Sequence, residues 1–442
     1  MSFFIRNATI INEGLSVQGS LFVSDGIIQR IYPATESPGI PAGATVIDAT
    51  RQWLLPGVID THVHFREPGA THKADVASET RAAAAGGVTS FIDMPNNTPA
   101  TTTLELLEEK CRRAAVTSLL NYSFYLGATN DNLDEIKRIK PAEVGGVKLF
   151  LGSSTGNMLV DNETTIAAIF AESPVLTAVH SEDDQLIRRN RDALVARYGE
   201  ALQAAIHPYI RTAEACLRST ERVMKLALKY RAAVHVLHVT TAGECALFSP
   251  GDAVTAEACV PHLWFDDTAY AHGQNFVKCN PAVKTAADRE ALRRAVDSGC
   301  ITTIATDHAP HTRHEKRQSY LQAPAGMPAV QYSLPLMLEL CREKIFTPEM
   351  VVERMCHAPA RLFKIARRGF IREGYYADLA LVHPDREWRI TDATVLSKCG
   401  WTPYAGTIVH TQVTHTFING ALVFANGEIN DAAKGQRLLF TA

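Results

Sequence analysis

The segment Leu54-Leu55-Pro56-Gly57-Val58-Ile59-Asp60-Thr61-His62-Val63-His64-Phe65-Arg66 joins an apolar run to a group of polar side chains. The apolar run predicts a buried strand over Leu54–Asp60. Because side chains alternate between the faces of a strand, we expect His62 and His64 to project to the same side. Two neighbouring imidazoles are a common ligand pair for zinc-like ions, and Arg66 follows within reach of whatever such an ion binds. An isolated His-x-His is more often an ordinary surface or core pair, so the metal interpretation depends on the rest of the chain.

Through the middle of the chain, apolar segments that predict strands alternate with amphipathic segments that predict helices. Eight strands are expected: Leu54–Asp60, Val88–Asp93, Tyr122–Ala128, Val144–Leu151, Val175–His180, Ala233–Val239, Ala253–Ala258 and Ile301–Thr306. The expected helices between them include Lys73–Ala85, Leu104–Ala115, Thr212–Tyr230 and Ala286–Ser298. Eight β/α units in roughly 310 residues predict an α/β fold of the (β/α)8 TIM-barrel type with insertions, over residues 54–370. An open, doubly wound sheet is the alternative.

Both ends of the chain consist instead of short apolar stretches separated by turn residues, which is typical of antiparallel strands. Six such strands are expected: Ser2–Ile11, Ser16–Val23, Ile27–Tyr32, Ala44–Asp48, Asp378–Val382 and Thr414–Phe424. Because these β segments flank a long middle, they predict one small β-sandwich domain assembled from residues 1–53 and 371–442.

The composition of the 442 residues restricts the function classes. A hydrophobic content of 46% and a charged content of 21% are ordinary for a soluble globular protein. The net charge of -3 comes without a dense Lys/Arg block, which argues against binding to nucleic acid or to an anionic membrane. The N-terminus lacks a secretion signal, and no apolar run is long enough to cross a bilayer. Nine scattered cysteines without a CxxC pair indicate reduced thiols, so we expect a cytoplasmic protein.

Active sites of TIM-type barrels lie at the carboxyl ends of the strands. Metal-type residues close four of the eight expected strands: His62, His64, His180, His238 and Asp307. This coincidence predicts a metal centre. Strand alternation places His235 and His238 on opposite faces, and spacing alone does not choose between them. His308 follows Asp307 directly and is a candidate for orienting a ligand.

Lys148 lies inside the fourth apolar strand, where an ammonium group either pairs with an acid or loses its charge. A neutral amine can take up carbon dioxide and become a carbamate, whose carboxylate-like group can bridge two metal ions. A structural ion pair with Glu257 is the alternative. Four histidines, one carboxylate and one carbamate suffice for two ions that share a hydroxide. Asp307 would then take the proton of that hydroxide and pass it on.

With these residues in place, the chain resembles the cyclic amidohydrolases, and among them the dihydroorotase branch. The likeness runs over nearly the whole length. The motifs that carry it are Leu55–Gly69, Ala84–Thr89, Asp93–Asn97, Lys278–Pro281, Asp307–His311, Ala323–Gly326 and Ala358–Phe363. Their order along the chain makes the resemblance specific, although no single motif is.

The resemblance implies two zinc ions per chain, bridged by carboxylated Lys148. One ion would be held by His62, His64, Lys148 and Asp307. The other would be held by Lys148, His180 and His238. The preference for His238 over His235 rests on the resemblance.

The resemblance also implies the reaction, which is the reversible interconversion of (S)-dihydroorotate and N-carbamoyl-L-aspartate in de novo pyrimidine biosynthesis. Metal-activated hydroxide would attack the ring amide while Asp307 shuttles the proton. Arg66, Asn96 and His311 would bind the substrate carboxylate, and Asn280 would contact the ring. Relatives are commonly homodimers, so the resemblance implies a homodimer here, and the binding partner that it implies is the small-molecule substrate.

Two other functions remain open. Allantoinases and hydantoinases share the metal site but lack the pair Arg66 and Asn96. A non-catalytic subunit would be expected to lose metal ligands, and this chain keeps all of them.

Small departures from the family pattern, Leu263 after His262 and Thr212 in place of a proline, concern substrate fit and loop shape. The polar segment Thr312–Gln322 is either a mobile lid or an ordinary solvated loop.

Overall fold

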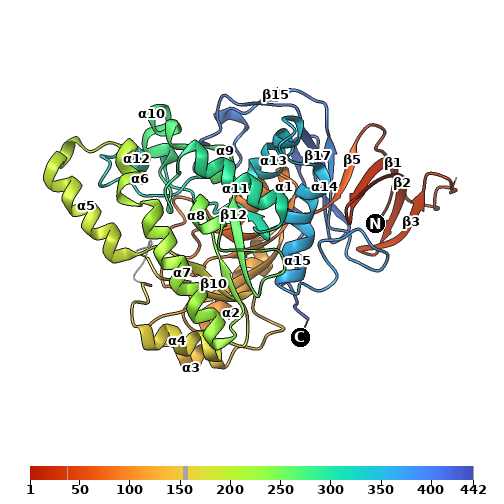
Figure 1. Ribbon diagram of the computed structural model, residues 1–442. Coiled ribbons are helices and arrows are strands. Elements are labelled where there is room, and N and C mark those ends of the chain that lie inside the picture. Colours follow the sequence, from red (N-terminus) through yellow and green to blue (C-terminus); the bar gives the residue numbers. More distant parts are fainter. Residues whose placement is uncertain (37, 153–157, 442) are drawn as a thin grey trace.

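The computed structural model describes residues 1–36, 38–152 and 158–441. Its centre is an eight-stranded parallel sheet in the order β13-β12-β11-β10-β9-β8-β7-β6 (Figure 1). The strands are β6 (Val58–Val63), β7 (Val88–Asp93), β8 (Asn121–Gly127), β9 (Gly146–Phe150), β10 (Thr177–His180), β11 (Val234–Val236), β12 (Val254–Cys259) and β13 (Thr303–Ala305). The two ends of this order meet, because His64 N donates to His308 O at 2.7 Å just beyond β13. The expected TIM-type barrel is therefore confirmed, and the open sheet is not what forms.

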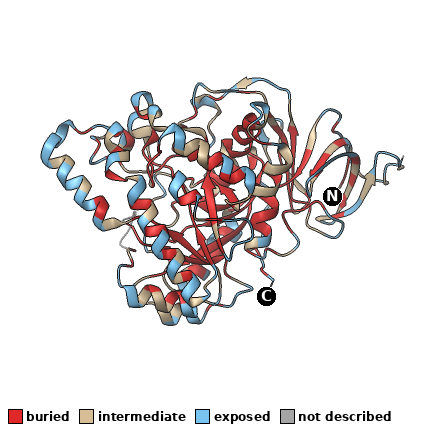
Figure 2. Ribbon diagram, in the orientation of Figure 1, coloured by how far each residue is buried: buried red, intermediate tan, exposed pale blue. Residues whose placement is uncertain are grey.

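The helices surround the barrel, and several of them begin at side-chain caps. Asp75 and Ser78 form a capping box at the start of α1 (Val76–Ala85), so this helix begins three residues after the expected Lys73. Thr212 caps α7 (Ala213–Tyr230). Other helices of the outer layer are α2 (Leu104–Thr117), α3 (Leu133–Lys137), α4 (Glu163–Glu172), α5 (Asp184–Tyr198), α8 (Ala242–Cys245), α11 (Ala286–Ser298), α13 (Ser333–Arg342), α14 (Pro348–Val352) and α15 (Ala358–Leu362). Figure 2 shows the result, with buried strands inside and helices whose outer faces are exposed.

Strands from both ends of the chain form a second, nine-stranded mixed sheet, at the right of Figure 1. Its strands are β1 (Ser2–Asn12), β2 (Leu15–Ser24), β3 (Ile27–Pro33), β4 (Thr45–Asp48), β5 (Trp53–Pro56), β14 (Leu379–His383), β17 (Gln412–Ile418), β18 (Ala421–Ala425) and β19 (Glu428–Ile429). The two halves join where β5 pairs with β14. The expectation that the two termini build one β unit is confirmed, and its hydrogen bonding makes one continuous sheet.

The strand expected over Leu54–Asp60 is in fact two strands that belong to different sheets. Trp53–Pro56 pairs with the terminal sheet, whereas Val58 onward pairs with β7 of the barrel. Gly57 separates them, and a Cβ at this position would lie 2.2 Å from the side chain of Thr89. The chain therefore changes sheets at a point where only glycine fits.

β11 and β13 end before His238 and Asp307, the candidate metal ligands that follow them in the sequence. β11 ends at Val236 and β13 ends at Ala305. The backbone then enters the left-handed region at His238 (φ 40°) and at Asp307 (φ 48°). Non-glycine residues in this region are uncommon, and backbone strain of this kind clusters at active sites. In the described part of the chain, no helix is both long and apolar enough to span a membrane.

Candidate active site

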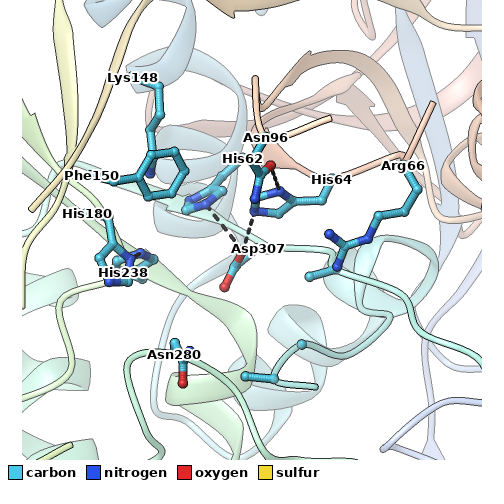
Figure 3. Close-up of a pocket in the computed structure, with 13 residues that line it drawn as sticks. His62, His64, Arg66, Asn96, Lys148, Phe150, His180, His238, Asn280 and Asp307 are labelled. Atoms are coloured by element: carbon cyan, nitrogen blue, oxygen red, sulfur yellow. Dashed lines mark hydrogen bonds and ion pairs between the residues drawn. The ribbon is translucent and has the colours of Figure 1, made fainter. Parts of the chain in front are cut away.

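One pocket lies at the carboxyl ends of the barrel strands (Figure 3). Its lining residues are His62, His64, Arg66, Asn96, Lys148, Phe150, His180, His238, Asn280, Asp307, Ala309, Ala325 and Gly326. The structure thus brings nine of the ten residues singled out from the sequence to one place. The tenth, His311, lies directly behind Arg66.

His62, His64 and Asp307 converge in this pocket. The Nε2 atoms of the two histidines lie 3.3 Å and 3.1 Å from Asp307 Oδ1. Each residue offers one possible ligand atom, and the three atoms all lie within 4.8 Å of one another. Two nitrogen atoms of buried histidines and one oxygen atom of a partly buried carboxylate at this spacing match the N and O donor set of zinc-type sites.

The outer ring nitrogens of three histidines are held by oxygen atoms. His62 Nδ1 lies 2.7 Å from Glu257 Oε1, His64 Nδ1 lies 2.8 Å from Asn96 Oδ1, and His180 Nε2 lies 2.9 Å from Glu182 Oε2. Metal-binding histidines usually have such an outer partner, which fixes the ring so that the other nitrogen faces the ion.

The surroundings of His62 favour positive charge on its pocket side. Both of its ring nitrogens face carboxylate oxygens, those of Glu257 and Asp307. A neutral imidazole carries only one N–H and can satisfy only one of them. A metal ion between His62 Nε2 and Asp307 would be bound by both groups and would leave the ring N–H for Glu257.

His180 and His238 form a second pair of converging nitrogens. His180 Nδ1 lies 2.9 Å from His238 Nε2, and burial lowers the pKa of both rings. Two neutral rings in this position place nitrogen donors close enough to share one ion. Among the described residues, His238 Nδ1 is buried and has no hydrogen-bond partner.

Lys148 is fully buried on β9, with its Nζ 4.6 Å from the centre of the Phe150 ring. In the described ranges, no carboxylate oxygen lies within 4.0 Å of this Nζ. The ion pair with Glu257 considered from the sequence is therefore absent, because Glu257 contacts His62 instead. Burial lowers the pKa of Lys148 to about 7, so a large share of the amine is neutral near neutral pH.

Arg66 provides a cation at the edge of the pocket. Its side chain is 7% exposed, its Nε donates to Pro310 O at 3.1 Å, and its Nη2 lies 3.1 Å from His311 Nε2. Burial lowers the pKa of Arg66 to about 10, which still leaves the guanidinium charged at neutral pH. His311 Nδ1 in turn lies 3.0 Å from Lys73 Nζ. His311 therefore supports the position of Arg66 from behind.

The sequence left the roles of His235 and His308 undecided. The structure shows that neither lines the pocket, whereas His238 does. His235 lies deeper in the barrel, with its ring nitrogens 2.7 Å from Thr255 Oγ1 and 3.2 Å from Thr303 Oγ1. His308 contacts Glu79 of α1 at 2.8 Å, so its side chain holds a helix and does not face the pocket.

The segment Thr312–Gln322 is anchored by buried groups. α12 (Arg313–Lys316) begins with a capping box formed by Thr312 and Glu315. Lys316 Nζ is buried and donates to Pro324 O at 2.9 Å and to Gly326 O at 2.8 Å. These contacts fix the segment against residues 323–326, two of which, Ala325 and Gly326, line the pocket.

Glu182 and Glu257 are partners of pocket histidines that were not expected from the sequence. Glu182 follows His180 by two residues, and this spacing was a usable signal. Glu257 reaches His62 from the seventh barrel strand, which no sequence pattern shows. Phe150, Ala309 and Gly326 also line the pocket without having been singled out.

The fold and the pocket define a TIM-type barrel protein with a histidine-rich candidate metal centre. A model described as Dihydro-orotase-like matches residues 51–209, and a model described as Amidohydrolase family matches residues 202–423. The chain belongs to the amidohydrolase family, as a dihydroorotase-like cyclic amidohydrolase.

Individual relatives differ in their named activity. The chain is 35% identical to a dihydroorotase of Halobacterium salinarum over 90% of this chain and 92% of that one. It is 31% identical to an allantoinase of Streptomyces avermitilis, covering 98% of both. Its fold is similar to that of an L-hydantoinase from Arthrobacter aurescens, with a TM-score of 0.92 and 24% identity over 99% of each chain. These relatives share the cyclic amidohydrolase class but not one substrate.

Proposed function

We propose that this protein is a dihydroorotase, which interconverts (S)-dihydroorotate and N-carbamoyl-L-aspartate. The observation that carries the proposal is the buried guanidinium of Arg66 at the edge of the pocket, next to the candidate metal ligands. Dihydroorotate carries a carboxylate, and an arginine fork binds a carboxylate with charge-assisted hydrogen bonds. The dihydroorotases among the relatives support the same choice.

We further propose that the pocket holds two zinc ions. His62, His64 and Asp307 would hold one and His180 and His238 the other, with carboxylated Lys148 shared between them. When bound, two such metal ions make a water molecule acidic enough to react at neutral pH and polarise the carbonyl group that is attacked. The lowered pKa of Lys148 supports the carbamate, because only the neutral amine adds to carbon dioxide, releasing one proton.

Asp307 is proposed to carry the proton. Burial raises its pKa, but His62, His64 and Lys148 outweigh this effect and hold it well below its ordinary value, so the group is a carboxylate. In hydrolysis it would accept a proton from the attacking water and donate it to the ring nitrogen as the C–N bond breaks. In ring closure the same carboxyl group would work in reverse.

Arg66 and Asn96 are proposed to orient the substrate carboxylate, with His311 holding Arg66 in place. Asn96 Oδ1 already contacts His64 Nδ1 at 2.8 Å, so this residue would link a metal ligand to the carboxylate site. Asn280, at the opposite side of the pocket from Lys148 in Figure 3, is proposed to contact the ring.

The second candidate function is that of an allantoinase or hydantoinase, which the 31% identity to an allantoinase favours. Steady-state hydrolysis of dihydroorotate, allantoin and hydantoin by the same metal-loaded preparation separates the two. Our proposal requires dihydroorotate to have the highest kcat/KM of the three.

A further inference from the structure

His207 lies outside the set of residues singled out from the sequence, at the start of α6 (His207–Ile210). Its ring is buried and contacts two other segments of the chain. Nε2 lies 2.9 Å from Cys279 O and 3.0 Å from Asn280 Oδ1, and Nδ1 lies 2.7 Å from the Tyr320 hydroxyl. The ring therefore connects Tyr320 to a residue that lines the active-site pocket.

The positions of the protons on this ring follow from its partners. Burial lowers the pKa of His207 well below its ordinary value, so the ring is neutral and carries one N–H. The carbonyl of Cys279 can only accept a hydrogen bond, which places that N–H on Nε2. Nδ1 then has a lone pair and accepts from the Tyr320 hydroxyl.

This arrangement decides which way the amide of Asn280 points. Because His207 Nε2–H is a donor, the Asn280 atom that faces it must be the oxygen. The Asn280 Nδ2 atom has no hydrogen-bond partner among the described residues, and Asn280 lines the pocket together with His238 and Asp307 (Figure 3). The NH2 group of Asn280 is thus a hydrogen-bond donor on this side of the pocket.

We propose that His207 is a positioning residue that, together with Tyr320, holds the Asn280 amide with its NH2 group toward the substrate. The inference rests on the proposed function in that it assigns Asn280 to the substrate ring. Its consequence is a specificity rule: the ring must present a hydrogen-bond acceptor, such as a carbonyl oxygen, to Asn280. A ring N–H at that position would face another donor and would be rejected.

Contacts of neighbouring residues stabilise the positions of His207, Tyr320 and Asn280. Lys278 Nζ donates to Tyr320 O at 2.8 Å and to Ala323 O at 2.6 Å, which ties the segment of Tyr320 to that of Asn280. Tyr270 packs edge-on against the same histidine ring, but its hydroxyl accepts from Val283 N at 3.1 Å. Tyr270 is therefore a matched control for Tyr320.

The test compares single and double variants with metal content measured alongside. His207→Phe keeps an aromatic ring but removes all three hydrogen-bond contacts of the imidazole nitrogens, and we expect KM to rise about tenfold with bound metal unchanged. His207→Gln keeps an N–H donor and should restore KM to within about threefold of the wild type. Tyr320→Phe should raise KM, whereas Tyr270→Phe should not.

A double-mutant cycle distinguishes positioning from a general structural role. If His207 acts through Asn280, then His207→Phe should add nothing to the KM of Asn280→Ala. Effects that multiply in the double variant would overturn the proposal, as would an unchanged KM in His207→Phe.

Nitrogen-15 NMR of histidine-labelled wild type reads the tautomer without any turnover. The proposal requires the Nε2–H form of His207, and an Nδ1–H form would overturn it. If the wild type hydrolyses another cyclic amide but not dihydroorotate, the proposed function fails. The cycle is then measured on that other substrate, so the two failures are distinguishable.

Discussion

Glu257 Oε1 lies 2.7 Å from His62 Nδ1, and Nε2 of the same ring lies 3.3 Å from Asp307 Oδ1. Glu257 is fully buried on β12 (Val254–Cys259), on the opposite side of the ring from the pocket. The histidine is thus aimed at the pocket by a carboxylate that does not itself line it.

This relationship predicts the effect of removing Glu257. Glu257→Leu should lower zinc affinity about 10–100-fold, because His62 loses the partner that fixes its orientation and raises its basicity. Glu257→Gln keeps an acceptor oxygen and should lose less. Competition with a chromogenic chelator measures the affinities, and wild-type zinc binding by the leucine variant would contradict the assignment.

Lys148→Ala should abolish activity and release metal, because it removes the amine that would become the bridging carbamate. A short carboxylic acid such as acetate or propionate should partly restore both by occupying the vacated space. The readouts are metal content by mass spectrometry and turnover with and without the acid. Full activity of Lys148→Ala would show that the carbamate assignment is wrong.

Arg66→Met should weaken the complex with dihydroorotate by about 1.5–3 kcal/mol, the usual value of a hydrogen bond to a charged group. This corresponds to a rise in KM of roughly 10–150-fold. Bound metal should not change, since Arg66 is not a ligand. Unsubstituted hydantoin carries no carboxylate, so any turnover of hydantoin by the wild type should be unchanged in Arg66→Met. An equal loss of activity with dihydroorotate and with hydantoin would argue against carboxylate binding.

Lys110 holds the loop that follows β7 through a buried ion pair. Its Nζ lies 2.6 Å from Asp93 Oδ2 and 2.7 Å from Asn97 Oδ1. Lys110→Met leaves the buried Asp93 carboxylate without its cationic partner and should cost about 3–5 kcal/mol of unfolding free energy. The matched control is Arg113→Met, which removes the exposed ion pair with Glu109.

Denaturant titration of both variants makes the comparison. The midpoint should fall clearly for Lys110→Met and stay unchanged for Arg113→Met, because exposed pairs contribute little. Equal midpoints for the two variants would show that the buried pair does not support this loop.

The sequence predicted the barrel because buried parallel strands are nearly continuous apolar runs and the helices between them are amphipathic. It did not predict the division at Gly57, since the run from Leu54 to Ile59 is apolar throughout. Residues 53–56 leave the barrel because β14, from the far end of the chain, pairs with them. Such a long-range pairing leaves no periodic signal in either segment.

The pocket was predictable to the extent that strand ends bring side chains together. His62, His64, His180, His238 and Asp307 all lie in one pocket, although their roles as ligands stay predictions. His207 was not predictable, because its partners Cys279, Asn280 and Tyr320 lie 72 to 113 residues further along the chain. Only tertiary packing reveals such a contact.

We propose that the function is defined by the carboxylate of the substrate, which Arg66 binds. The most direct measurement is kcat/KM of one zinc-loaded preparation for dihydroorotate, allantoin and hydantoin, measured side by side. We predict the highest value for dihydroorotate, together with ring closure of N-carbamoyl-L-aspartate by the same preparation. A higher kcat/KM for allantoin or hydantoin than for dihydroorotate would contradict the account.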